Sequence, residues 1–145
     1  MSENSTLYNI IVNGSMDDLK KTLPTLKINT KDEDGMSLLA WAAIDGSNKK
    51  VAFLLENGAN PNIKCNEGMT PLMYAASHNH PDIIRTLLKA GANPEIGDKS
   101  GWTAETWADI YWNEKAKFVL REHRKTVAYQ KPFRIPKQNE NNHSR

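Results

Sequence analysis

The chain has 145 residues, of which 39% are hydrophobic and 25% charged, proportions that are ordinary for one soluble globular domain. No apolar run approaches the roughly 20 residues that a membrane-spanning helix needs, and residues 1–6 show neither a basic leader nor an apolar stretch. The single cysteine, Cys65, excludes an internal disulfide. We therefore expect no membrane contact, no secretory signal and a cytoplasmic or nuclear location.

The formal net charge of +2 is distributed unevenly along the chain. Residues 124–145 carry six lysines and arginines against the single acid Glu140, a net charge of +5, which leaves residues 1–123 with −3. The basic character belongs to the C-terminal segment, so we expect any contact with nucleic acid to involve that segment alone.

Similar residues recur at a spacing of 33 positions, which predicts a stack of equivalent supersecondary units. The aligned sets are Gly35, Gly68 and Gly101, then Ala42, Ala75 and Ala108, then Leu54, Leu87 and Leu120. We name the segments unit 1 (5–31), unit 2 (32–64), unit 3 (65–97), unit 4 (98–123) and the tail (124–145).

Unit 1 aligns with unit 2 at a shift of 32 rather than 33. Leu7 then matches Leu39, and Leu23 matches Leu55. Too little chain precedes Leu7 for another hairpin, so we interpret unit 1 as the N-terminal cap of the stack.

Units 2 and 3 are predicted to form two short helices each, and the signals are clearest in unit 3. Thr70 before Pro71 predicts a helix N-cap with proline at the first helical position. A second helix begins at Pro81, and its apolar residues lie on one face before Gly91 ends it. Those apolar residues are Ile83, Ile84, Leu87 and Leu88.

The same two units resemble ankyrin repeats. In unit 3, Gly68-Met-Thr-Pro-Leu-Met-Tyr-Ala-Ala76 and Leu87-Leu-Lys-Ala-Gly-Ala-Asn-Pro94 are similar to the family patterns G-x-T-P-L-H-x-A-A and L-L-x-x-G-A-x-x-N, and unit 2 matches nearly as well. The histidine of the motif is replaced by Ala40, Met73 and Thr106. The resemblance covers residues 5–123 and implies an all-α solenoid of helix-turn-helix units joined by short β-hairpin loops.

Unit 4 carries charges at positions that are apolar in units 2 and 3. These charged residues are Glu105, Asp109, Lys117 and Arg121. Because buried unpaired charges would prevent another unit from stacking there, we interpret unit 4 as the C-terminal cap and expect the array to end near His123.

The resemblance implies that a partner binds to the hairpin tips and to the concave surface formed by the first helices and their ends. Met36, Met69 and Trp102 follow the hairpin glycines in one register, and we expect them to form an exposed apolar stripe with Trp102 as the leading contact. The alternative is that each side chain folds back over its own unit. Polar residues at the same tips are further candidates for partner contact; the alternative is that the tips are solvated loops. These polar candidates are Glu33, Asp34, Asn66, Glu67, Lys99 and Ser100.

A second aligned set comprises Trp41, Tyr74 and Trp107, and we expect these rings to pack between helices rather than to meet a partner. The ends of the first helices add further contact candidates, since aromatic residues accumulate there in unit 4. These candidates are Asp45, His78, Tyr111 and Trp112.

No catalytic, cofactor or metal site is predicted. His78 and His80 have no third or fourth ligand in an evident arrangement, and Cys65 has no catalytic partner that the sequence reveals. The resemblance implies one secondary candidate for modification, hydroxylation of Asn62.

The tail shows no helical period from Arg124 onward and contains Pro132 and Pro136, so we expect an extended basic segment that is disordered by default. Its aromatic and β-branched side chains between prolines also fit a linear docking motif. The motif residues are Tyr129, Phe133, Arg134 and Ile135.

Together these features predict a non-enzymatic protein–protein interaction module, an adaptor or small subunit of an intracellular complex, that is monomeric on its own. Two alternatives stay open. One is an assembly chaperone or inhibitor that masks a partner surface transiently, and the other is a nucleic-acid-associated protein that uses the basic tail. The sequence does not identify the partner.

Overall fold

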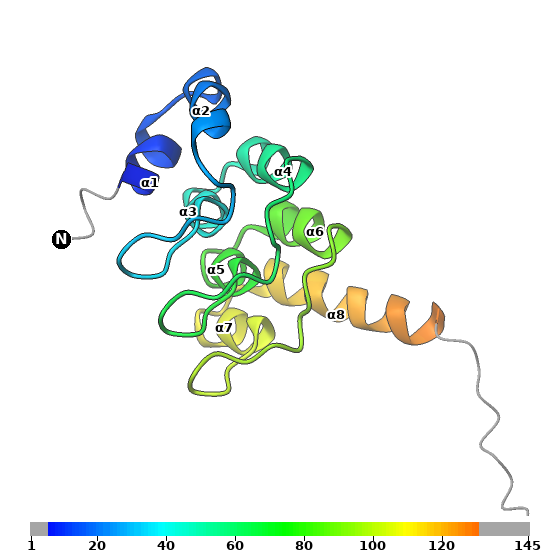
Figure 1. Cartoon of the computed structure of the whole chain (residues 1–145). Helices are drawn as coiled ribbons and strands as arrows, with labels where there is room; N and C mark the ends of the chain where they lie inside the picture. The colour runs from blue at the N-terminus through cyan, green and yellow to red at the C-terminus, as the bar shows by residue number, and fades with distance from the viewer. Residues whose placement is uncertain (1–5, 131–145) are drawn as a thin grey trace, which may run out of the picture.

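The computed structural model describes residues 6–130 of the chain (Figure 1). Within this range the chain is helical and contains no strand, so the all-α class is confirmed. The one β-type pairing among these residues is an isolated antiparallel bridge between Lys31 and Ser37. No helix between residues 6 and 130 is both long and apolar enough to cross a membrane.

The helices follow the predicted units. Unit 1 contains α1 (Thr6–Tyr8), the π-helical turn η2 (Asn9–Asn13), α2 (Met16–Thr22) and the 3-10 turn η3 (Leu23–Thr25). Units 2 and 3 contain α3 (Leu38–Asp45), α4 (Asn48–Glu56), α5 (Pro71–Ser77) and α6 (Pro81–Lys89). The chain then forms α7 (Ala104–Ile110) and α8 (Glu114–Gln130).

Two rows of helices form the stack (Figure 1). Helices α3, α5 and α7 lie side by side in an inner row, and α4, α6 and α8 form an outer row against it. The three loops that precede the inner helices project to the same side, away from the outer row. This arrangement confirms the predicted solenoid of helix pairs.

The inner helices begin at side-chain caps in equivalent positions. The hydroxyl oxygens of Ser37, Thr70 and Thr103 accept from backbone N–H groups three residues later, and Pro71 occupies the first turn of α5 as predicted. An Ala at such a cap costs about 1 kcal/mol, so the three caps together fix where the inner row starts.

Alanines allow the inner helices to approach closely. Ala42, Ala75, Ala76 and Ala108 have no solvent exposure and lie in the continuous core with the buried leucines of the outer row. Because interiors are packed as densely as organic crystals, a larger side chain at these positions would force the rows apart.

Polar side chains fix the register between consecutive units. Asn29 Oδ1 accepts from the backbone N–H of Asn60 at 2.8 Å, and Asn62 Oδ1 accepts from that of Asn93 at 2.8 Å. Between α5 and α8, Asn113 Nδ2 donates to the carbonyls of Ala76 and Ser77. The two asparagine bonds satisfy backbone N–H groups of the loops, and Asn113 binds carbonyls at the C-terminal end of α5.

Helix α8 corrects the predicted end of the helical array. The helix was expected to stop near His123, but it continues to Gln130, so residues 124–130 of the tail are helical. Arg124 pairs with Glu105 of α7, and Lys125 pairs with Glu122 at 3.0 Å. Arg124 and its neighbours are compatible with a helix, and the first residue that is not is Pro132, two positions past the observed end.

Candidate interaction surface

The hairpin tips, residues 32–36, 65–69 and 98–102, are built on one plan. In each tip the first residue donates its backbone N–H to the carbonyl of the last, at 2.9 to 3.0 Å. Neighbouring tips are also joined, since Asn66 donates its side-chain amide to the Glu33 carbonyl at 2.9 Å. A Cβ on Gly35 would lie 2.7 Å from the backbone nitrogen of Asn66, so this contact requires glycine.

In the first and third tips, an aspartate side chain hydrogen-bonds to both the tip backbone and the tryptophan of the inner helix that follows. Asp98 Oδ1 accepts from the backbone N–H groups of Ser100 and Trp102, and its Oδ2 accepts from Trp107 Nε1, each at 2.9 Å. Asp32 makes the equivalent bond to Trp41 Nε1 at 2.9 Å. This link was not predicted from the sequence, although its signal is present there as an aspartate nine residues before a tryptophan in units 2 and 4.

Unit 3 replaces this aspartate–tryptophan pair with Cys65 and Tyr74 at the same spacing. The Tyr74 hydroxyl lies 3.2 Å from Cys65 Sγ and 3.2 Å from Met36 Sδ. Burial of the ring, reinforced by the contact with Cys65, raises the pKa of Tyr74 well above its usual range, so the phenol stays neutral at physiological pH.

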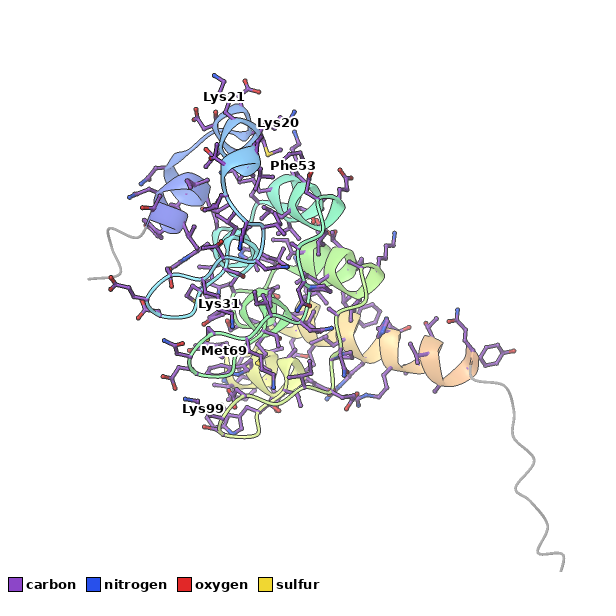
Figure 2. All side chains as sticks on the ribbon, viewed as in Figure 1. Lys20, Lys21, Lys31, Phe53, Met69 and Lys99 are labelled. Atoms are coloured by element: carbon purple, nitrogen blue, oxygen red, sulfur yellow. The ribbon has the colours of Figure 1, made fainter. Side chains whose placement is uncertain are left out.

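The prediction of an exposed apolar stripe across the three tips is wrong for Met36, the first residue of that stripe. Met36 is 6% exposed, because its side chain turns inward to the Tyr74 hydroxyl. Met69 is half-buried against the core, whereas Trp102 is 42% exposed. Figure 2 shows Met69 at the second tip and Lys99 at the third. Met36 therefore packs against the next unit rather than over its own, and Trp102 is the member that presents a large apolar surface.

The rings of Trp41, Tyr74 and Trp107 are half-buried and pack against the core, in agreement with the expected packing role. Tyr8 meets Trp41 edge to face with ring centroids 5.0 Å apart. Trp41, Tyr74 and Trp107 occupy equivalent positions on α3, α5 and α7, and we call the side of the inner row that carries them the inner face.

Aromatic side chains gather at the last inner helix. Trp102 meets Trp107 edge to face with centroids 5.2 Å apart, and Trp107 stacks on Tyr111 at 6.1 Å. Ile110 is the last residue of α7, and Trp112 follows in the turn to α8. We call these five residues the aromatic surface. Tyr111 is 55% exposed and Trp112 84% exposed, so much of this surface is open to solvent.

Exposed acidic residues lie on the first two tips and at the far, C-terminal end of α3. Glu33, Asp34 and Glu67 lie exposed on the first two tips, and Asp45 ends α3. None of these four carboxylates forms an ion pair within residues 6–130. Lys99 and Ser100 are exposed on the third tip.

The charged residues predicted to cap unit 4 pair with one another across α7 and α8. Arg121 Nε lies 2.9 Å from Glu105 Oε1, and Lys117 binds Asp109. Partial burial by itself would raise the pKa of Glu105, but the guanidiniums of Arg121 and Arg124 outweigh it and hold that pKa below its usual value. These pairs join α7 to α8 and neutralise the charges of the predicted cap.

The two remaining predicted site residues, His78 and Asn62, lie on different parts of the stack. His78 lies exposed at the end of α5 and stacks on His80 at 6.2 Å, and no group of three potential metal ligands exists in the described residues. Both polar atoms of the Asn62 side chain are bonded, to Asn93 and Gly91, and its modification stays a prediction.

The predicted tail motif divides at the end of α8. Tyr129 lies in the last turn of the helix and is almost fully exposed. The other motif residues, Phe133, Arg134 and Ile135, lie outside the described residues.

A further exposed aromatic residue was not anticipated. Phe118 is 62% exposed and lines a groove of about 310 Å³ between α6 and α8, on the outer row. It belongs to the opposite row from the aromatic surface, which makes it a useful reference position.

Comparison with known proteins agrees with this geometry. A family model described as ankyrin repeats in three copies matches residues 7–98. A search of curated proteins gave no match to the chain.

Proposed function

The chain belongs to the ankyrin-repeat family, whose members are generally protein–protein interaction modules, and on this premise we propose a non-enzymatic adaptor or small subunit of a complex in the cytoplasm or nucleus. The proposed partner is another protein. It binds across the hairpin tips and the inner face, and the chain is monomeric without it.

The observation that carries the proposal is the position of the exposed apolar side chains. Every large hydrophobic residue that is exposed within residues 6–130 lies in unit 4 or α8. Such residues are Trp102, Ile110, Tyr111, Trp112, Phe118, Val127 and Tyr129. Binding energy in protein interfaces concentrates in tryptophan and tyrosine, and the aromatic surface offers both beside the third tip.

Rigidity of this region supports the same proposal. Asp98 binds the tip backbone and Trp107 together, while the third tip is tied to the second through Lys99 N–H and the Glu67 carbonyl at 3.2 Å. A surface that is already ordered loses little conformational entropy on binding, so more of the contact energy becomes affinity.

A protein partner is favoured over nucleic acid because most of the basic residues on α8 already form ion pairs within the chain. Arg121 and Arg124 are paired with Glu105, and Lys125 with Glu122. Phosphate binding would have to compete with these contacts. We therefore retain the tail as an additional anchor and the transient chaperone or inhibitor as the alternative role.

The test is affinity capture with the full chain and with the double variant Trp102→Ala, Tyr111→Ala. We expect the double variant to recover its partners at least about tenfold less efficiently, since two central aromatic side chains cost more than about 1.4 kcal/mol of binding. Phe118→Ala is the matched control, because it removes an exposed aromatic ring from the outer row. Equal recovery by the double variant and the wild-type chain, with unchanged circular dichroism, would contradict the proposal.

A further inference from the structure

The outer row carries a groove of about 310 Å³ between α6 and α8. Its α6 wall is formed by Arg85, Leu88 and Lys89. Its α8 wall consists of residues whose spacing places them on one face of the helix, namely Phe118, Val119, Glu122, His123 and Thr126. Because these residues follow one another along α8, the groove runs parallel to this helix and toward its C-terminal end.

The groove presents apolar surface that the stack does not cover. Leu88 and Val119 are nearly buried and belong to the core, whereas the Phe118 side chain is exposed. Within residues 6–130 the Phe118 ring meets no other aromatic ring and no cation. An apolar side chain from another segment is therefore the occupant that this groove favours.

The chain itself continues from the end of this groove. Figure 1 shows α8 extending past the helices of the stack, and Thr126, the last lining residue, lies about one turn before Gln130, where the helix ends. At a rise of about 1.5 Å per residue, Gln130 is about 6 Å beyond Thr126 and about 12 Å beyond Glu122. Pro132 disfavours continuation of the helix, so the chain can reverse its direction there.

The sequence of residues 131–136, which lie outside the described residues, suits the groove. Phe133 and Ile135 are two positions apart, so an extended chain directs both to one side and Arg134 to the other. The prolines at both ends of this stretch restrict the backbone before it docks, which lowers the entropy lost on docking.

The segment is also long enough to reach the groove. An extended chain advances about 3.3 Å per residue, so Phe133 reaches about 10 Å back from Gln130 and Ile135 about 16 Å. These distances bring Phe133 level with Thr126 and Ile135 level with Glu122. Two apolar side chains of the segment thus meet the stretch of α8 that lines the groove.

Charge neither drives nor prevents this docking. The last carbonyls of α8 lack partners within the helix and its last turn contains no basic residue, so Lys131 and Arg134 would lie close to the negative end of the helix dipole. On the α6 wall Lys89 has the same sign as the segment, while Arg85 is paired with Asp82 at 3.0 Å. Apolar contact therefore has to stabilise the docked segment, and we expect salt to change its docking little.

We propose that residues 131–136 fold back along α8 and place Phe133 and Ile135 in the groove between α6 and α8. The segment then covers the outer row of unit 4 and shields Phe118 from solvent. The predicted linear motif binds its own chain, and the aromatic surface on the inner row stays open to the partner protein.

The test uses fluorine NMR on the full chain labelled with para-fluorophenylalanine. Only three residues carry the label, which are Phe53, Phe118 and Phe133. A synthetic peptide of residues 127–145 gives the signal of Phe133 in the absence of the groove. We expect the Phe133 signal of the full chain to lie away from its position in the peptide, at low and at high salt alike.

Two full-length variants locate the docking site. Thr126→Arg fills the end of the groove with a longer, charged side chain. Val127→Arg is the matched control, because Val127 is the neighbouring exposed β-branched residue and does not line the groove. We expect Thr126→Arg to move the Phe133 signal to the peptide position and Val127→Arg to leave it unchanged.

Trypsin gives a second measurement, since it cuts after lysine and arginine. The segment contains one such site at Arg134, and Lys137 lies just beyond it. We expect the Arg134 site of the full chain to be cut at least about threefold more slowly, relative to the Lys137 site, than in the peptide, because the docked segment must open before it is cut.

Either a Phe133 signal at the peptide position in the wild-type chain or peptide-like cleavage at Arg134 would overturn the proposal. It is also wrong if the signal leaves the peptide position only when the partner protein is added, because the segment then binds the partner. An equal response to Thr126→Arg and Val127→Arg would show that the segment does not lie in the groove. None of these measurements depends on the aromatic surface, so the inference stands or fails separately from the proposed function.

Discussion

Asp98 shows how much of the third hairpin tip depends on one side chain. One carboxylate oxygen holds two backbone N–H groups of the tip, and the other holds the Trp107 indole. Charge-assisted hydrogen bonds of this kind contribute more than neutral ones. The position of Trp102 relative to Trp107, and so the shape of the aromatic surface, follows from this residue.

We predict that Asp98→Ala lowers the free energy of unfolding by about 1–3 kcal/mol, because three donors lose their acceptor. Asp98→Asn should cost less, since the amide oxygen still accepts from the tip backbone while its nitrogen cannot accept from Trp107. Urea unfolding of the two variants checks this order. An alanine variant as stable as the wild-type chain would show that the carboxylate does not hold the tip.

At the scale of elements, the pairing of α7 with α8 depends on Glu105, which binds both Arg121 and Arg124. Its pKa in the folded chain lies below the ordinary 4.5 of an unfolded glutamate. A group with a lowered folded pKa stabilises the fold above its unfolded pKa, and the contribution is lost as the pH falls through the folded value.

We predict that Glu105→Gln lowers the melting temperature at pH 7 and flattens the loss of stability below about pH 4.5, where the wild-type carboxylate takes up its proton. Glu122→Gln is the control, since Glu122 and Lys125 form an exposed pair one turn apart that contributes little. The measurement is a series of thermal melts from pH 7 to pH 3. An identical pH dependence for Glu105→Gln and the wild-type chain would contradict the role of this pair.

The helix pairs were predictable from sequence because their signals are local. The alanine and leucine periods, the Thr70 cap and the glycine stops each act within one turn of helix, and the structure has the predicted pairs. The continuation of α8 to Gln130 was not predicted, since it is supported by the pairing of Arg124 with Glu105, which lies 19 positions earlier.

The candidate surface was likewise predictable only where its signals lie within one unit. Register indicated Trp102, Tyr111 and Trp112 as contact candidates, and all three are exposed. Register could not show that Met36 turns inward, because that depends on the Tyr74 hydroxyl in the next unit, 38 positions away. The partners that bury a side chain in a stack come from a neighbouring unit, and a single-unit pattern does not contain them.

At the scale of the whole molecule, the stack is asymmetric. Hairpin acids without ion pairs lie on units 2 and 3, whereas the exposed aromatic side chains and most ion pairs lie on unit 4 and α8. A partner that followed the inner face would meet charge at one end and aromatic rings at the other. Such an arrangement gives the partner a direction along the stack as well as an affinity.

The central claim is that the partner protein lies on the inner side of unit 4. It is tested most directly by placing a photo-reactive phenylalanine analogue at position 111 or at position 118 of the full chain, since Tyr111 and Phe118 are similarly exposed on opposite rows. We predict that light links the partner to the analogue at position 111 and not to the one at position 118. Adducts from position 118 with none from position 111 would contradict the account.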